Sequence, residues 1–180
     1  MNERQRLLEI LREKSVRTGE FTLASGKTSD FYVDARQTTL HAEGSRLVAS
    51  LMREVLDPEV VAVGGLTMGA DPIACSIAAT SPTDRPLHAF LIRKQAKGHG
   101  TGHYCEGLGN VPKGSKVAIV EDTTTTGGSL LTACERAATA GLEVIQCLTV
   151  VDRQEGAAER IAEAGWTLIA LTTRQDLLKS

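Results

Sequence analysis

The neighbouring carboxylates of Glu121 and Asp122 are the side chains whose type and position indicate chemistry most directly. They follow an apolar run, residues 117–120, and precede a hydroxyl-rich turn with two glycines, residues 123–128. Adjacent acids at the end of a buried strand repel each other unless hydroxyl donors or a cation satisfy them. The amides and hydroxyls of the turn suit a phosphate, and a helix that begins at Ser129 would favour its negative charge. We therefore predict a sugar-phosphate site.

Two common nucleotide-binding motifs do not match this segment. A P-loop needs the pattern GxxxxGK[ST], and the lysine of that pattern is absent here. A dinucleotide-binding fingerprint has its acidic residue about twenty residues after the glycines, whereas here the acids precede them. The plainer alternative is that the acids only cap the next helix, and the phosphate-binding turn that follows at once argues against it.

A second polar segment, residues 93–103, carries basic side chains among glycines. Its cationic members are Arg93, Lys94, Lys97 and two histidines, of which His99 is the first. Several donors of this kind would close over a pyrophosphate, and the glycines would supply hinge freedom. The segment therefore predicts a mobile cationic lid, and a solvated surface loop is the alternative that stays open.

The elements that must position these segments alternate regularly along the chain. Apolar strand-like runs occupy residues 60–63, 87–92, 117–120, 142–151 and 166–172, and helical patterns lie between them at residues 72–79, 129–140 and 156–164. This alternation predicts an α/β fold with a mostly parallel central sheet and helices on both faces. In such sheets ligands bind at the carboxyl ends of the strands, so the turns at residues 64–71, 93–107, 121–129 and 152–155 should meet at one rim.

The N-terminal part of the chain has a different rhythm. A first helix is expected after Asn2 as N-cap, with an apolar face formed by Leu7, Leu8, Ile10, Leu11 and Val16. Residues 19–40 have the pattern of short strands and turns, and a second helix follows with an apolar face at Leu47, Val48, Leu51, Met52 and Val55.

Composition limits the classes of function. A chain of 180 residues with 42% hydrophobic residues predicts one globular domain, and a net charge of −2 gives no reason to expect a nucleic-acid or membrane partner. The chain has no membrane-length apolar run and no signal-peptide pattern at its N-terminus. Its four cysteines are widely spaced, which favours reduced thiols and a cytoplasmic location.

The segment that contains Glu121 and Asp122 resembles the 5-phosphoribosyl 1-pyrophosphate (PRPP) signature of the type I phosphoribosyltransferases. Three further segments are similar to the orotate phosphoribosyltransferases within that group: residues 21–27, the basic run at residues 93–103, and residues 151–155. The resemblance covers nearly the whole chain. It implies the type I phosphoribosyltransferase fold in a single domain, residues 1–180. A hood of residues 1–40 and 166–180 would stand on a core of residues 41–165, with a mobile lid at residues 93–107.

The resemblance also implies an activity. The enzyme would transfer the 5-phosphoribosyl group from PRPP to orotate, giving orotidine 5-phosphate and pyrophosphate in UMP biosynthesis, with Mg²⁺ as cofactor. It would be a homodimer in which the lid reaches across to the neighbouring subunit. Two other readings stay open. One is a phosphoribosyltransferase for another nucleobase, and the other is a non-catalytic regulator that senses PRPP and binds nucleic acid.

The site residues follow by the same resemblance. The catalytic residues would be Lys94, Lys97, His99 and Asp122. PRPP would be bound by Arg93, Lys94, Lys97, His99, Glu121, Asp122, Thr123, Thr124, Thr125, Thr126, Gly127, Gly128 and Ser129. Orotate would be bound by Thr125 and Arg153, with the arginine paired to the orotate carboxylate. The metal would be held mainly by PRPP, with Glu121 and Asp122 nearby.

The sequence departs from the better-known bacterial members at two places. They carry a lysine where this chain has Ala24, and another in the turn that here reads Thr67-Met68-Gly69-Ala70-Asp71. Gln95 also stands where an acidic residue is frequent, and we assign it no role. The residue that replaces the two absent lysines is not evident from the sequence.

Overall fold

A computed structural model describes residues 2–22, 28–96 and 103–179. Within that part of the chain the central sheet has six strands in the order β5-β4-β3-β6-β7-β8. The strands are β3 (Ala62–Leu66), β4 (His88–Ile92), β5 (Cys105–Glu106), β6 (Lys116–Thr124), β7 (Glu143–Asp152) and β8 (Leu168–Thr173). All neighbouring pairs are parallel except β4 and β5. The predicted fold class, α/β with a mostly parallel sheet, is confirmed.

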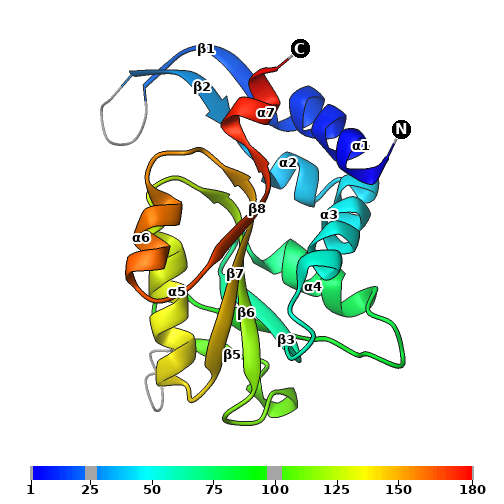
Figure 1. Ribbon diagram of the computed structural model, residues 1–180, viewed down its shortest axis with the longest axis vertical. Coiled ribbons are helices and arrows are strands. Elements are labelled where there is room, and N and C mark those ends of the chain that lie inside the picture. The colour runs from blue at the N-terminus through cyan, green and yellow to red at the C-terminus, as the bar shows by residue number, and fades with distance from the viewer. Residues whose placement is uncertain (1, 23–27, 97–102, 180) are drawn as a thin grey trace.

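Helices cover both faces of this sheet (Figure 1). One side carries α3 (Ala42–Val55) and α4 (Asp71–Ala79), and the other carries α5 (Gly128–Thr139) and α6 (Ala157–Glu163). Alternate residues of β6 serve the two cores, since Ala118 and Val120 pack with the first pair while Val117 and Ile119 pack with the second. This is why the predicted strand is apolar at every position: both of its faces are buried.

The N-terminal segment is joined to the C-terminal segment by hydrogen bonds. It comprises α1 (Glu3–Ile10), a π-helical turn η1 (Leu11–Ser15), an antiparallel pair of strands, β1 (Val16–Thr22) and β2 (Thr28–Val33), and α2 (Arg36–Thr39). The guanidinium of Arg12 donates to the carbonyls of Asp176 at 2.7 Å and Lys179 at 2.5 Å, in and just after α7 (Arg174–Leu178). The two chain ends therefore lie side by side above the sheet (Figure 1).

Several element boundaries differ from the sequence analysis. Asn2 does cap the first helix, accepting from the Gln5 amide at 2.8 Å, but Val16 begins β1 instead of continuing the helical face. The strand predicted at residues 60–63 lies at Ala62–Leu66, because Gly64 pairs with both β4 and β6. The short helices α2 and α7 were not predicted, since each has only four or five residues and too little periodicity to detect.

The division into hood, core and lid remains a prediction. The structure does show that β8 belongs to the central sheet, where it pairs with β7, and that α7 follows it directly. A short 3-10 turn, η2 (Leu108–Asn110), follows β5. None of the described helices is both long and apolar enough to cross a membrane.

Candidate active site

Glu121 and Asp122 lie within the carboxyl-terminal half of β6 and not after the strand. The strand continues to Thr124 because its residues pair with β7 as far as Asp152. Glu121 is buried, with 7% of its surface exposed, and Asp122 is half-buried. The Asp122 amide donates to the Glu121 carboxylate at 3.3 Å, and the Thr123 amide donates to Asp122 at 2.8 Å. The sheet and the local backbone thus hold both acids at its rim.

Burial changes the protonation of Glu121. Desolvation and the neighbouring charge of Asp122 raise the pKa of the Glu121 carboxyl to about 8, against a smaller opposing influence of Lys94. Glu121 therefore carries a proton at neutral pH in the free protein. Protonation of Glu121 relieves the repulsion between the adjacent acids that the sequence leads us to expect.

The turn after β3 presses against this acidic pair. A Cβ atom built at Gly69 would lie 2.5 Å from Oδ1 of Asp122 and 2.8 Å from Oε1 of Glu121. No side chain fits at this position without displacing the carboxylates, so glycine is required there by close approach of the backbone. The turn supplies backbone and the exposed Met68 to the site, and no charged side chain before Asp71.

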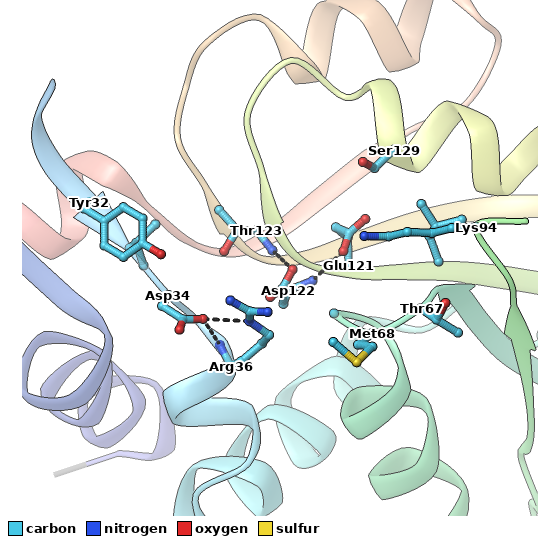
Figure 2. Close-up of a pocket in the computed structure, with 13 residues that line it drawn as sticks. Tyr32, Asp34, Arg36, Thr67, Met68, Lys94, Glu121, Asp122, Thr123 and Ser129 are labelled. Atoms are coloured by element: carbon cyan, nitrogen blue, oxygen red, sulfur yellow. Dashed lines mark hydrogen bonds and ion pairs between the residues drawn. The ribbon is translucent and has the colours of Figure 1, made fainter. Parts of the chain in front are cut away.

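A cavity of about 270 Å³ opens between these elements (Figure 2). Its lining comes from the end of β2 and the start of α2, the β3 turn, the end of β4, and the end of β6. The lining residues are Tyr32, Val33, Asp34, Arg36, Leu66, Thr67, Met68, Gly69, Lys94, Glu121, Asp122, Thr123 and Ser129. Figure 2 shows Lys94 beside Glu121 and Arg36 on the other side of Asp122. We refer to this space as the acid-pair cavity.

A second cavity of about 320 Å³ lies around the turn between β6 and α5. Glu121 and residues 123–130 line it. Gly127 has φ 77°, a left-handed conformation that brings the chain round into the first residue of α5. The side-chain oxygens of Thr123 and Thr124 are buried without a hydrogen-bond partner among the described residues. A phosphate would satisfy unpaired hydroxyls beside a helix N-terminus, so this cavity has the chemistry of a phosphate site.

The structure separates the basic residues of the predicted lid. Lys94 lines the acid-pair cavity. Arg93 instead makes an ion pair with Glu106 at 3.4 Å, and its carbonyl accepts from Arg136 at 2.6 Å. Lys97 and His99 lie outside the described residues, as do Ala24 and its neighbours at residues 23–27.

Arg153 stands at the same rim but lines neither cavity. Its backbone amide donates to the Thr124 carbonyl at 2.9 Å, and its guanidinium pairs with Glu155 at 2.9 Å. Only 12% of the side chain is exposed, and its Nε is buried without a partner in the described part of the chain. Thr125 lines the phosphate-type cavity. Three of the four turns expected at one rim therefore line the cavities, and the fourth adjoins them through Thr124.

Sequence reasoning missed the wall formed by Tyr32, Asp34 and Arg36. Residues 31–34 were interpreted only as a short strand and its turn. An available signal was the charged pair Asp34 and Arg36 directly after apolar residues. No spacing rule connects that pair to Glu121, because the two segments meet only in the folded chain.

The acid pair provides oxygen donors that a metal ion could use. Among residues 2–22, 28–96 and 103–179, no three His, Cys, Asp or Glu side chains are grouped as a metal site. Mg²⁺ needs no such cage, because it keeps waters and binds one or two carboxylates together with substrate phosphates. The adjacent carboxyl groups of Glu121 and Asp122 fit that mode of binding. The Asp122 amide donates to the Glu121 carboxylate at 3.3 Å and keeps the two side chains together.

Comparison with known proteins defines the class. Residues 36–166 match the model of the phosphoribosyl transferase domain, and this chain is a phosphoribosyltransferase. The chain is 44% identical to the orotate phosphoribosyltransferase of Sorangium cellulosum (strain So ce56) over 98% of this chain and 94% of the relative. It is 47% identical to that of Corynebacterium glutamicum (strain R) over 97% and 93%.

Solved structures agree with these relatives. The Mycobacterium tuberculosis H37Rv orotate phosphoribosyltransferase in complex with PRPP matches with a TM-score of 0.82 and 41% identity, over 98% of this chain and 99% of that one. The same enzyme with Fe(III) dicitrate gives a TM-score of 0.86 at 44% identity, over 99% and 100%. The chain belongs to the orotate phosphoribosyltransferase family. The resemblance found in the sequence is thereby confirmed.

Proposed function

We propose that this chain transfers the 5-phosphoribosyl group of PRPP to orotate, releasing pyrophosphate and forming orotidine 5-phosphate in UMP biosynthesis. One observation carries the proposal: two adjacent acids, of which Glu121 is buried and Asp122 half-buried, stand between a phosphate-type cavity and an exposed lysine at one rim of the sheet. The printed names of the relatives, one of them solved with PRPP, support the same substrates.

The 5-phosphate of PRPP would occupy the cavity lined by residues 123–130. There the hydroxyls of Thr123 and Thr124 and the first amides of α5 would donate to its oxygens. The ribose 2- and 3-hydroxyls would lie against Glu121 and Asp122 at the mouth of the acid-pair cavity. The phosphate site and the acid pair would together hold the anomeric carbon in position for the incoming base.

The chemical step breaks the bond between the anomeric carbon and pyrophosphate and forms a bond from that carbon to the orotate ring nitrogen. Positive charge develops on the ribose and negative charge on the leaving group. Asp122 would stabilise the first charge, and Lys94 the second. Lys97 and His99, in the lid, would add further stabilisation and a proton for the pyrophosphate. Mg²⁺, when bound near Glu121 and Asp122, would neutralise charge on pyrophosphate oxygens.

Orotate would be positioned by Arg153 and Thr125. A guanidinium grips a planar carboxylate through two parallel hydrogen bonds. In the free protein the guanidinium of Arg153 is paired with Glu155, so binding of orotate in this way requires an exchange of partners. Arg93 likewise would have to leave Glu106 before it could contact PRPP.

The enzyme activity has a direct test. Absorbance of orotate is followed with the purified chain, and we expect a loss that requires both PRPP and Mg²⁺. Strong turnover of adenine, hypoxanthine or uracil with none of orotate would assign the chain to another base. Binding of PRPP without pyrophosphate release in the presence of orotate would indicate a sensor of PRPP.

A homodimer with a shared lid is part of the proposal. Its test is to mix Lys97→Ala and Asp122→Asn subunits, each inactive alone. If the lid acts across the interface, mixed dimers recover activity, because one of their two sites has both intact residues. Heterodimers that form without any recovery would exclude the shared site.

We also propose a cytoplasmic location, supported by the absence of a disulfide among the four cysteines.

A further inference from the structure

The acid-pair cavity has more carboxyl groups than cations. Its described lining has three carboxyl groups, on Asp34, Glu121 and Asp122, against two cations, Arg36 and Lys94, and Glu121 is protonated in the free protein. The proposed substrates are both anions, so a cavity without an excess of positive charge attracts them only where its cations are aimed at the ligand. The β3 turn offers none, because Gly69 has no room for a side chain and Met68 is apolar. Arg36, at the start of α2, is the cation on the opposite side of the acid pair from Lys94.

The local structure fixes the direction of Arg36. It is the first residue of α2, and the carboxylate of Asp34 accepts from its amide at 3.3 Å and from its Nε at 2.8 Å. Gln37 donates to the other oxygen of Asp34 at 3.3 Å. Burial of Asp34 opposes its ionisation, but these hydrogen bonds prevail and lower the pKa of its carboxyl. Asp34 is thus a charged clamp that holds one edge of the guanidinium.

The other edge of the guanidinium makes no hydrogen bond to the described part of the chain. Of the side-chain nitrogens of Arg36, only Nε donates a hydrogen bond within residues 2–22, 28–96 and 103–179, and Nη1 and Nη2 donate none there. The charge of Asp122 acts on Arg36, yet no ion pair joins them. Figure 2 shows the guanidinium between Asp34 and Asp122. Two donors in a planar fork therefore face the space beside the acid that is proposed to hold the ribose.

We propose that Arg36 is a substrate-binding residue that donates through its free Nη edge to anionic oxygens of the bound substrates, and that Asp34 positions it. This inference rests on the proposed function and deepens it. The oxygens belong either to the pyrophosphate group of PRPP or to the carboxylate of orotate. Arg36 then supplies from α2 a cation that the sequence lacks at the β3 turn.

The alternative is a purely structural role, in which Arg36 only neutralises Asp34 at the surface of α2. The substrate-binding and structural roles predict different behaviour of the conservative variant Arg36→Lys. A lysine would restore the charge but could not keep Asp34 and offer two parallel donors at once. If Arg36 binds substrate, Arg36→Lys should be intermediate between wild type and Arg36→Gln; if it is structural, Arg36→Lys should match wild type.

The experiment compares the wild-type full-length protein with Arg36→Gln, Arg36→Lys and Asp34→Asn. The matched control is Arg46→Gln, which removes an exposed arginine of α3 whose one hydrogen bond among the described residues is to the Ala42 carbonyl at 3.3 Å. Initial rates are measured with PRPP and orotate varied in turn, in the presence of Mg²⁺. Direct titrations with pyrophosphate and with orotate follow for each protein. Thermal midpoints verify that each variant is folded.

We expect Arg36→Gln to weaken one of these ligands about tenfold to a hundredfold, the usual size for a lost hydrogen bond to a charged group. Asp34→Asn should weaken the same ligand by less, and Arg46→Gln should not change either. A loss confined to pyrophosphate assigns the fork to PRPP, and a loss confined to orotate assigns it to the carboxylate. Wild-type affinity for both ligands in folded Arg36→Gln would overturn the inference. The proposed function fails separately, if the wild-type protein does not consume orotate. Even in that case, the titrations with pyrophosphate and orotate decide whether Arg36 binds these ligands.

Discussion

The acid side and the cation side of the active site are built in opposite ways. Glu121 and Asp122 sit on β6, a central strand that is paired with β3 and β7 and buried on both faces. Lys94 and Arg36 come from the ends of other elements and are exposed, and Asp34 holds one edge of the Arg36 guanidinium. A rigid anionic half on a buried strand therefore faces a cationic half made of exposed side chains.

This difference suits the proposed reaction. The ribose must be held in one place while its anomeric carbon reacts, and a buried strand end holds it best. The pyrophosphate must leave, and cations that are exposed to solvent can bind it and release it. We expect changes on the rigid side to have the larger effects, and the following experiments rank the two sides.

The largest effect is expected for Asp122→Asn. It removes the charge that would stabilise the developing ribose cation, and we expect kcat/KM to fall about 10²- to 10³-fold. Orotate consumption at saturating PRPP measures the loss. Asp84→Asn, at an exposed aspartate in the loop before β4, is the control and should retain full activity. A fall of less than threefold would remove the ribose role from Asp122.

The buried acid predicts a dependence of stability on pH. The pKa of Glu121 is raised from the ordinary value of 4.5 to about 8, so the folded chain binds a proton there that the unfolded chain has lost at pH 7. The stabilisation is present below pH 4.5 and is lost as the pH rises through 8. Glu121→Gln mimics the protonated acid, so its stability relative to wild type should increase by about 2–4 kcal/mol between pH 5 and pH 8.5.

Urea unfolding at both pH values measures this change. Glu143→Gln, at an exposed glutamate of β7, serves as the control and should follow wild type throughout. Parallel pH profiles for Glu121→Gln and wild type would show that Glu121 is ionised in the folded protein at neutral pH.

The rigid side should also resist the addition of a single methyl group. In Gly69→Ala the new Cβ meets the two carboxylates, and we expect kcat/KM to fall about tenfold or more because displaced acids no longer match the ribose. Gly109→Ala is the matched control, since a Cβ there meets no atom within 4 Å. Equal activity of the two variants would indicate that the β3 turn can move away freely.

The smallest effect is expected for salt. Exposed cations are screened, so the KM for PRPP should rise about threefold between 50 and 300 mM NaCl, while the acid pair is little affected. Arg36→Gln should show a weaker salt dependence than wild type, because one of the screened charges is gone. A salt-independent KM would mean that the cationic half is desolvated in the complex.

The sequence by itself determined the fold class and the acidic half of the site. Apolar residues at every position of 117–120 specify a strand buried on both faces, and the acids, hydroxyls and glycines that follow are contiguous, so local order already contains their geometry. The family followed for the same reason, since its most specific segment is a single uninterrupted run.

Only the tertiary structure decided which cations meet those acids. Between Arg36 and Asp122 the described chain passes through α3, β3, α4, β4, β5 and η2, and no periodicity relates the two positions. The same holds for the approach of Gly69 to the carboxylates and for the diversion of Arg93 to Glu106. Contacts between distant segments depend on how the helices and strands pack, and a side chain near a strand end turns toward whichever partner that packing brings within reach.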